Sequence, residues 1–148
     1  MKNTIIVDID GTMANCDHRQ ELAEAGRWED FHGLCHQDAP YPDIIQIVNT
    51  FGDAGYDIFA CTGRNERFRN KTLDWFVAHG VAVDDIWMRA DDEFGKDVEV
   101  KTAMMEKHFG SKEAVLENVL CVLEDRDKLV IGLRDYGLTV LQVREGKF

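Results

Sequence analysis

Short runs of apolar, largely β-branched residues alternate with longer amphipathic patterns along the whole chain. The apolar runs are strand candidates and cover residues 4–7, 56–61, 85–88, 119–123 and 138–143. Continuous apolar runs, without strict polar alternation, are typical of parallel strands that are buried on both faces. The sequence therefore predicts a parallel sheet of five strands.

Helical patterns fill the gaps between these strands, at residues 43–54, 66–79, 98–109 and 127–136. A glycine follows each pattern at once and acts as a helix stop signal. Regular β–α alternation predicts an open α/β sheet with right-handed crossovers. In such sheets ligands bind beyond the carboxyl ends of the strands, so the residues at those ends matter most for function.

The length of 148 residues predicts one domain, 1–148, and the apolar content of 45% argues against disorder. Residues 15–41 are long for a connection between a strand and a helix. Trp28, Phe31 and Leu34 in this segment favour a packed flap over a disordered loop.

The charge balance is strongly acidic, with 17 basic and 28 acidic residues and a net charge of −11. Non-specific coating of nucleic acid needs clustered Lys and Arg, so this composition argues against it. An enzyme that touches one end of a nucleic acid stays possible. The surplus carboxylates could hold a divalent cation.

The sequence disfavours a membrane-spanning protein and a disulfide-bonded protein. No run of about 18 apolar residues exists, so no membrane-spanning helix is expected. The four cysteines form no CxxC pair, and Cys61 and Cys121 read as buried free thiols. We therefore expect a reduced, cytoplasmic setting.

Acidic residues follow the first strand candidate as Asp8-Ile9-Asp10-Gly11-Thr12. Alternation along an extended chain puts Asp8 and Asp10 on the same side. Two carboxylates placed in this way suit a nucleophile with a neighbouring general acid, or two metal ligands. The alternative is a solvated polar turn.

The ends of two other strands carry Thr62-Gly63-Arg64 and Glu124-Asp125. A hydroxyl, exposed backbone N–H groups and a guanidinium form a plausible phosphate cradle, although a plain turn with a surface Arg would look the same. Adjacent acids after a buried strand are costly unless a cation offsets them, but an acid there can also cap the next helix.

Three other polar groups have competing interpretations. Lys101 either faces the carboxylates or lies on a solvated helix face. The basic residues 64–71 form either a solvated face or a contact for a substrate backbone. Residues 16–18 and 32–36 contain Cys and His, but their spacing matches no standard zinc module, so we favour a polar loop.

Taken in order, the DxDGT, Thr-Gly-Arg, Lys and Glu-Asp motifs resemble the haloacid dehalogenase (HAD) superfamily of aspartyl-phosphate phosphotransferases. Within it, the chain resembles the 3′-phosphatase domain of bacteriophage polynucleotide kinase/phosphatase. The stretches that carry this likeness are VDIDGTMA (7–14), KDVEVK (96–101), EDR (124–126), GLTVLQV (137–143) and GKF (146–148). The resemblance implies a HAD-like Rossmannoid three-layer sandwich with no separate cap domain, and a flap at 15–41 that borders the active site.

The resemblance also implies roles for the acidic residues. Asp8 would be the nucleophile that becomes an aspartyl phosphate, and Asp10 the general acid and then the base. Mg²⁺ would be bound by Asp8, the Asp10 backbone carbonyl and Asp125. Close family members have Asp-Asp where this chain has Glu124-Asp125. Glu124 would support the ligands of the ion or contact the ion through water, and the division of labour between it and Asp125 is left open.

For the remaining site residues the resemblance implies contacts with the phosphate. Thr62 would donate to a phosphoryl oxygen, and Lys101 would offset charge on the phosphate and Asp8. Asp97 would orient Lys101, because positions i and i+4 meet on a helix face, although a surface ion pair is the plain alternative. Phosphate or nucleotide contacts would come from Arg19, Gly63 and Arg64.

These features lead to one leading function and two alternatives. A site without a cap is open and suits a polymer end, which favours removal of a 3′-phosphate from a polynucleotide during nucleic acid repair. The sequence contains no GxxxxGK[ST] motif, so we expect a stand-alone phosphatase. The resemblance alone implies a phage or bacterial origin. The alternatives are a nucleotidase or other small-molecule phosphomonoesterase, and a non-catalytic binding module. The oligomeric state is left open.

Overall fold

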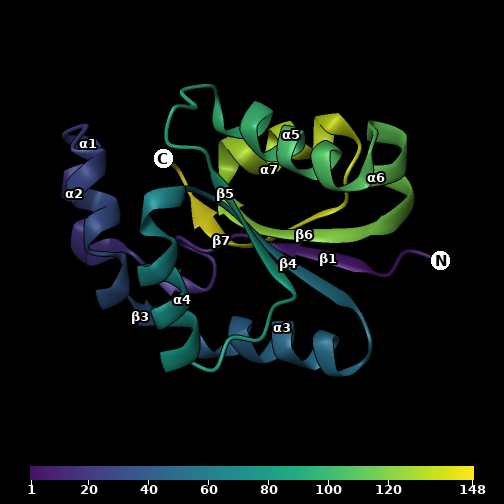
Figure 1. Cartoon of the computed structure of the whole chain (residues 1–148), viewed down its shortest axis with the longest axis horizontal. Helices are drawn as coiled ribbons and strands as arrows, with labels where there is room; N and C mark the ends of the chain where they lie inside the picture. The colour runs from purple at the N-terminus through teal and green to yellow at the C-terminus, as the bar shows by residue number, and fades with distance from the viewer.

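A five-stranded parallel sheet forms the centre of the computed structural model, which describes all 148 residues (Figure 1). The strands lie in the order β5-β4-β1-β6-β7 and every neighbouring pair is parallel. Their bounds are β1 (Thr4–Val7), β4 (Asp57–Asn65), β5 (Asp85–Arg89), β6 (Val119–Arg126) and β7 (Val140–Gly146). The predicted parallel sheet of five strands is thus confirmed.

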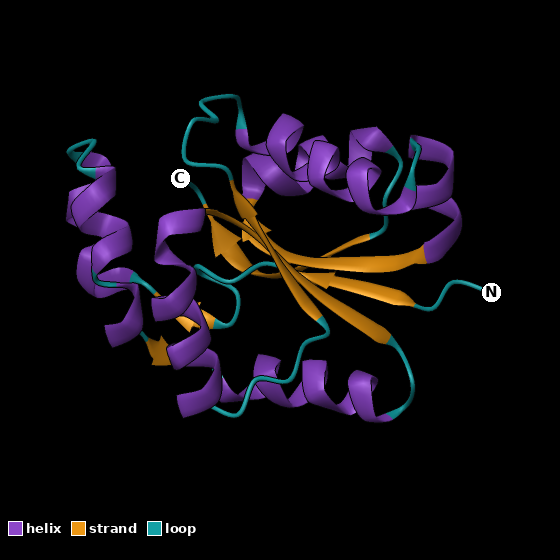
Figure 2. Cartoon of the chain, in the orientation of Figure 1, coloured by secondary structure: helices purple, strands orange, loops and turns teal.

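Helices cover both faces of the sheet and complete the predicted three layers (Figure 2). One face carries α3 (Pro42–Asp53) and α4 (Arg69–Ala78), and the other carries α5 (Asp97–Phe109), α6 (Lys112–Asn118) and α7 (Asp127–Tyr136). Helix α6 was not predicted. The hydroxyl oxygen of Ser111 accepts a hydrogen bond from the Ala114 N–H and caps this short helix.

The central strand β1 divides the core into two apolar clusters. Ile5 and Val7 pack into the cluster beneath α3 and α4, whereas Ile6 packs into the cluster beneath α5, α6 and α7. Successive side chains of a strand point to opposite faces, so a continuous apolar run is what two covered faces require. This burial fixes the register of β1 and with it the position of the residues that follow.

Two strands run further than the sequence predicted. β4 continues through Thr62, Gly63 and Arg64, and β6 continues through Glu124 and Asp125. The pairing register shifts in both extensions, between Thr62 and Asn65 and between Glu124 and Arg126. The predicted strand ends at residues 61 and 123 are therefore too early, because irregular pairing lets a strand continue while it re-aims its polar side chains.

Residues 14–41 form a flap that returns to its starting point. β2 (Ala14–Asn15) pairs with β3 (Ala39–Pro40), and between them lie α1 (Gln20–Glu24) and α2 (Trp28–Gly33). Figure 1 shows α1 and α2 standing to one side of the sheet, away from α6. Two hydrogen bonds dock the flap on α4: Trp75 Nε1 donates to the Asp38 carbonyl at 2.8 Å, and Lys71 Nζ donates to the Gly33 carbonyl at 2.6 Å.

No helix in the structure combines the length and the apolar character needed to cross a membrane.

The docking of the flap gives a testable prediction. Trp75→Phe keeps an aromatic ring in a buried position but leaves the Asp38 carbonyl without its donor. We expect a loss of about 1–3 kcal/mol in the free energy of unfolding, measured by urea denaturation. Trp28→Phe is the matched control: its ring is largely exposed and makes no hydrogen bond, so the change should stay within about 0.5 kcal/mol. Equal unfolding midpoints for the two variants would contradict this docking.

Candidate active site

The carboxyl ends of β1, β4 and β6 bring together polar side chains from distant parts of the chain. β1 delivers Asp8, β4 delivers Thr62, and β6 delivers Glu124 and Asp125. Lys101 reaches the same point from α5. All of these side chains are buried, although each is polar. The sheet edge that was predicted to hold the site therefore does gather these residues.

Three of the buried side chains are carboxylates that share a single ammonium group. The carboxylate oxygens of Asp8, Glu124 and Asp125 lie within 4.8 Å of one another. Lys101 Nζ donates to Asp8 Oδ1 at 2.7 Å and to Glu124 Oε2 at 2.8 Å. The Thr12 hydroxyl lies 3.0 Å from Asp8 Oδ2 and 3.3 Å from Asp125 Oδ1. One positive charge thus faces three acidic groups.

The pKa values of these groups reflect their burial and the charges of their neighbours. Burial, and next the charge of Glu124, raise the pKa of Asp8 to about 7. Burial, and next the charge of Asp8, raise the pKa of Asp125 to about 9. Burial opposes ionisation of Glu124 as well, but Lys101 outweighs it and lowers the pKa of Glu124. A hard divalent cation prefers carboxylate oxygens and would offset this charge, so the residues present fit such an ion.

Glu124 differs from its two acidic neighbours because backbone N–H groups bind one of its oxygens. Oε2 accepts from Lys101, and Oε1 accepts from the backbone N–H groups of Asp125, at 3.0 Å, and Arg126, at 3.2 Å. Both oxygens of Glu124 are thus occupied by protein donors. This geometry favours Asp125 over Glu124 as a direct cation ligand. Glu124 instead orients Lys101.

Gly11 allows the turn after β1 to approach Asp125. Its φ angle is +82°, a left-handed conformation, and a methyl group in place of its hydrogen would lie 2.0 Å from Asp125 Oδ2. Arg144 of β7 holds the same turn, because its Nη1 donates to the carbonyls of Gly11 and Thr12. Its guanidinium lies 3.4 Å from the centre of the Tyr41 ring. The sequence analysis missed Arg144, since a lone Arg in an edge strand carries no motif.

Asp10 is held by two buried arginines. Nη2 of Arg19 lies 2.5 Å, and Nη2 of Arg64 2.7 Å, from Asp10 Oδ1. Arg19 also donates to the Asp38 carboxylate, with Nε at 2.8 Å and Nη2 at 2.6 Å. We call Asp10, Arg19, Arg64 and Asp38 the arginine clamp. Asp38 escaped the sequence analysis because it lies in the flap outside every motif.

The predicted phosphate contacts of Arg19 and Arg64 stay predictions, and in this structure both guanidinium groups bind protein acceptors. Nη1 of Arg19 donates to the Phe31 carbonyl at 2.9 Å, and Nη1 of Arg64 donates to Thr72 Oγ1 at 3.1 Å. Both guanidinium groups are fully buried and engaged by protein acceptors. A buried guanidinium needs such acceptors, and Asp10 supplies part of them. The arginines therefore act on Asp10 instead of facing the cavity.

The clamp sets the protonation state of Asp10. Burial by itself would raise the pKa of Asp10, but the charges of Arg64 and Arg19 outweigh it and hold this pKa well below its usual range. The two aspartates of the DxD motif thus have opposite electrostatic surroundings. Asp10 is an ionised carboxylate that can accept a proton, while Asp8 belongs to the cluster that lacks positive charge.

The remaining predicted residues surround a cavity of about 500 Å³ that is lined by Asp8, Asp10, Gly63, Asp97 and Lys101, among others. Thr62 Oγ1 accepts a hydrogen bond from the Arg64 N–H at 3.1 Å, which leaves its proton available for another acceptor. Gly63 presents its backbone to the cavity, as a phosphate cradle requires.

Asp97 does not orient Lys101, and that prediction is wrong. Its carboxylate accepts from Arg89 Nη2 at 2.5 Å and from Arg126 Nη1 at 2.7 Å. Burial would raise the pKa of Asp97, but the hydrogen bond and charge of Arg126 outweigh it and lower this pKa. The helix spacing did bring Asp97 near, but the strand ends offer Lys101 two buried carboxylates that bind it more strongly.

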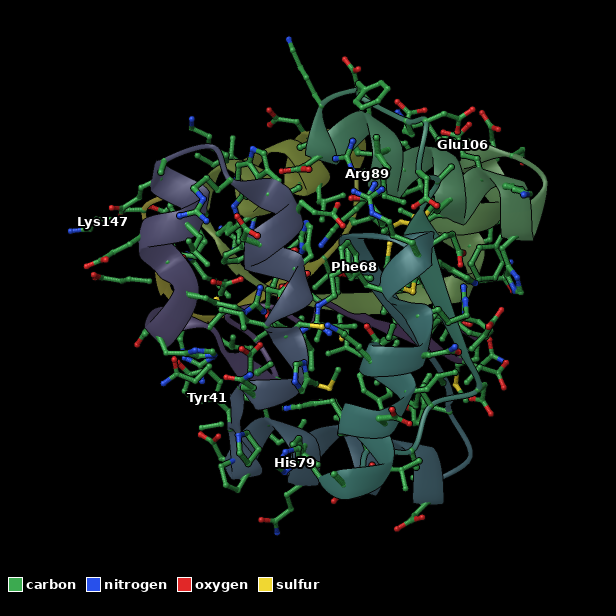
Figure 3. All side chains as sticks on the ribbon, turned by 60° about the vertical axis from the view of Figure 1, so that its left-hand side comes forward. Tyr41, Phe68, His79, Arg89, Glu106 and Lys147 are labelled. Carbon is green, nitrogen blue, oxygen red and sulfur yellow. The ribbon has the colours of Figure 1, made fainter.

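The basic cluster and the Cys/His segments have separate structural roles. Arg67 lines the cavity and pairs with Glu29 and Asp91, whereas Arg69 pairs with Glu66 away from it. In the flap, His18 Nε2 lies 2.7 Å from Asp38 Oδ1. Phe68, labelled in Figure 3 between the flap helices and α4, packs against His32. The side chains named here thus form ion pairs, a hydrogen bond and a ring contact within the protein.

This fold, with a DxDGT turn facing a buried Lys and a second acidic strand end, defines a phosphatase of the HAD superfamily. Within it, the chain belongs to the family described as "Polynucleotide kinase PNKP phosphatase domain", whose sequence model matches residues 2–148. The resemblance to the HAD superfamily and, within it, to a polynucleotide kinase phosphatase domain is thereby confirmed.

Solved structures agree with this fold. Two chains described as "Structure of the Pnkp1/Rnl/Hen1 RNA repair complex" and "Structure of Pnkp1/Rnl/Hen1 complex" match with TM-scores of 0.82 and 0.81 and sequence identities of 21% and 22%. Each match covers 98% of this chain but only 43% and 47% of the longer chains. This chain therefore spans less than half the length of these relatives.

A class C acid phosphatase from Bacillus anthracis with tungstate bound matches with a TM-score of 0.58 and 18% identity, over 84% of this chain and 52% of that one. No curated protein sequence matches the chain.

The close approach at Gly11 leads to a second prediction. Gly11→Ala should abolish phosphatase activity, because the new methyl group must displace Asp125, and should cost about 1–3 kcal/mol of stability from the left-handed backbone. Gly55→Ala is the matched control, with a φ of +95° and no atom within 4 Å of the new methyl group. It should lose similar stability but keep its activity. Activity and urea denaturation measure the two effects, and an active Gly11→Ala variant would contradict the geometry.

The carboxylate cluster predicts how pH and metal removal affect stability. The folded state keeps a proton on Asp8 up to about pH 7 and on Asp125 up to about pH 9, whereas the unfolded state releases both near the ordinary value of 3.8. Because the folded state binds more protons in this range, stability in EDTA should fall as pH rises from about 5 to 8.5. Mg²⁺ replaces the protons, so the gap between melting temperatures with Mg²⁺ and with EDTA should widen with pH.

Calorimetry across this pH range measures that gap. Asp125→Asn removes one of the two titrating groups and should flatten the fall in EDTA. A melting temperature in EDTA that rises over the same range would contradict the prediction.

Proposed function

We propose that this phosphatase removes the 3′-phosphate from polynucleotide ends, with Mg²⁺ and through an aspartyl phosphate on Asp8. The observation that carries the proposal is the position of Asp8. It lines the cavity and is bonded to Lys101, beside carboxylates that fit a divalent cation, with the clamped Asp10 two residues away. A nucleophile, a charge-offsetting group and a proton acceptor therefore share one cavity.

In the first step a carboxylate oxygen of Asp8 forms a bond to phosphorus while the bond from phosphorus to the leaving 3′-oxygen breaks. Lys101 offsets negative charge on Asp8 and the phosphoryl group, and the free proton of Thr62 can be donated to a phosphoryl oxygen. Mg²⁺, held by Asp8, Asp125 and the backbone carbonyl of Asp10, would supply further charge neutralisation.

The leaving oxygen requires a proton in this step, and the attacking water must lose one in the step that hydrolyses the aspartyl phosphate. Asp10 lines the cavity and lies outside the carboxylate cluster, so it suits both transfers. The arginine clamp keeps Asp10 ionised, as the base half of this role requires, but it also makes Asp10 a weaker base. The acid half requires that the negative charge of the bound phosphate raise the pKa of Asp10.

The choice of a polynucleotide end is supported by the family and by the shape of the chain. The family is that of polynucleotide kinase phosphatase domains, and the first two matching structures are described as Pnkp1/Rnl/Hen1 complexes, one of them as an RNA repair complex. The flap leaves a cavity between itself and the β5–α5 loop that reaches the surface. A net charge of −11 predicts a small footprint of few nucleotides.

A nucleotidase is the second candidate, because a cavity of about 500 Å³ has the size of a small-molecule site. A non-catalytic binding module is disfavoured by the presence of Asp8, Asp10, Thr62, Lys101 and Asp125 in one site. The cytoplasmic setting stays a prediction.

Phosphate release from a short oligonucleotide with a 3′-phosphate tests the proposal. We expect release with Mg²⁺, loss with EDTA, and loss of at least 100-fold in Asp8→Asn, because Asp8 forms the covalent bond. A 5′-phosphorylated copy and a free 3′-mononucleotide run beside it. Equal or faster release from the mononucleotide would favour the nucleotidase, and Mg²⁺ binding without release from any phosphate ester would favour the binding module.

A further inference from the structure

Exposed aromatic rings line the cavity beyond the catalytic cluster. Trp28 at the start of α2 is 55% exposed, Phe94 in the β5–α5 loop is 89% exposed, and Phe148 is 45% exposed. All three line the same cavity as Asp8 and Asp10. Figure 1 shows α2 and the β5–α5 loop on opposite sides of the C-terminal end, so the rings come from two different walls.

The flap wall is a packed group of rings. Trp28 contacts Phe31 edge-on with ring centres 5.7 Å apart, and it stacks on His32 at 6.3 Å with an angle of 29° between the planes. Burial lowers the pKa of His32 to about 4, so this ring is neutral at physiological pH. The exposed face of Trp28 is therefore supported from behind by an uncharged aromatic surface.

The opposite wall holds Phe94 out from the body of the protein. Arg89, labelled in Figure 3, fixes the loop: its Nη1 donates to the carbonyls of Glu93 at 3.2 Å and Gly95 at 2.9 Å. Glu93 Oε1 also accepts from the Gly95 N–H at 2.6 Å. A large apolar ring presented by a fixed loop at the mouth of a catalytic cavity contributes little to folding and is available to bind a ligand.

The charges of the cavity favour stacking over contacts with a nucleic acid backbone. Its arginines are already paired: Arg67 with Glu29 and Asp91, and both Arg89 and Arg126 with Asp97. Backbone phosphates beyond the reacting one therefore find few free cations. The aromatic faces are the unoccupied binding groups, and bases stack on such faces whatever their sequence.

We propose that Trp28 and Phe94 form a stacking subsite for the unpaired nucleobases next to the 3′-phosphate of a single-stranded nucleic acid end. This inference rests on the proposed function for the position of the phosphate at Asp8. Phe148 lies beneath Arg126, whose Nε donates to its carbonyl at 3.0 Å, and extends the apolar lining. The subsite binds any base, whatever its identity, because every base can stack on an aromatic face.

Steady-state kinetics with a 3′-phosphorylated single-stranded oligonucleotide test the subsite. Trp28→Ala and Phe94→Ala should each raise KM about 5- to 100-fold while kcat changes less than twofold, because stacking on the substrate is lost. Trp28→Phe should keep most of the affinity. The matched control is Val77→Ala on α4, which is 84% exposed and lies outside the cavity, and its KM should not change.

An oligonucleotide with abasic sites at its 3′ end separates stacking from other effects. Wild type should show the raised KM on this substrate, and Trp28→Ala should add nothing further. A KM for Trp28→Ala and Phe94→Ala equal to that of Val77→Ala would overturn the proposal.

Binding without turnover distinguishes this proposal from the proposed function. An unphosphorylated oligonucleotide should quench tryptophan fluorescence in wild type and not in Trp28→Phe, because the other two tryptophans, Trp75 and Trp87, do not line the cavity. Quenching without any 3′-phosphate release would retain the subsite and overturn the proposed function. Phosphate release with neither quenching nor a KM effect would retain the proposed function and overturn the subsite. If quenching and release were both absent, the subsite and the proposed function would both be overturned.

Discussion

The ammonium group of Lys101 is the contact on which the catalytic edge of the sheet depends. It bonds to Asp8 and Glu124 at once, and so allows three carboxylates to lie within 4.8 Å in a buried place. Without it, repulsion and the cost of burial would push the ends of β1 and β6 apart. The single lysine compensates only part of the negative charge, and the rest is what makes the site suited to a divalent cation. The strand ends, the Gly11 turn and the cavity are all arranged around this incomplete balance.

A second charge arrangement, two residues further along, has the opposite effect. In the arginine clamp the charges of Arg64 and Arg19 outweigh burial and lower the pKa of Asp10, whereas burial and the charge of Glu124 raise the pKa of Asp8. The pKa values of two aspartates in one short motif are therefore shifted in opposite directions, and these environments separate their chemical roles. The clamp reaches Asp10 from the flap through Arg19 and from β4 through Arg64. The flap is thus a structural part of the catalytic apparatus as well as a border of the cavity.

Local patterns in the sequence were sufficient for the sheet and for the residues on it, and insufficient for the partners of those residues. The residues of β1 form an apolar run because both faces of the strand are covered, so this run was enough to predict the strand. Arg19 and Arg64 were recognised, but their partners were not, because an arginine motif does not reveal whether it will meet phosphate or a buried carboxylate. Asp38 is the partner that decided this, and it lies in a flap whose course depends on tertiary contacts. Helix α6 was missed because its seven residues offer too few turns for a periodic signal.

The flap also links the two ends of the cavity through one short helix. Phe31 of α2 supplies the carbonyl that accepts from Arg19, and its ring lies 4.0 Å from the Arg19 guanidinium. The same ring packs against Trp28, the exposed aromatic residue of the flap wall. A base that stacks on Trp28 would therefore rest on a helix that also fixes the clamp on Asp10. Because both contacts come from one helix of six residues, the proposed stacking site and the clamp on Asp10 share one support. On the proposed function, shape and stacking, anchored on the flap, would replace electrostatic attraction when this acidic chain with few free cations binds a polymer end.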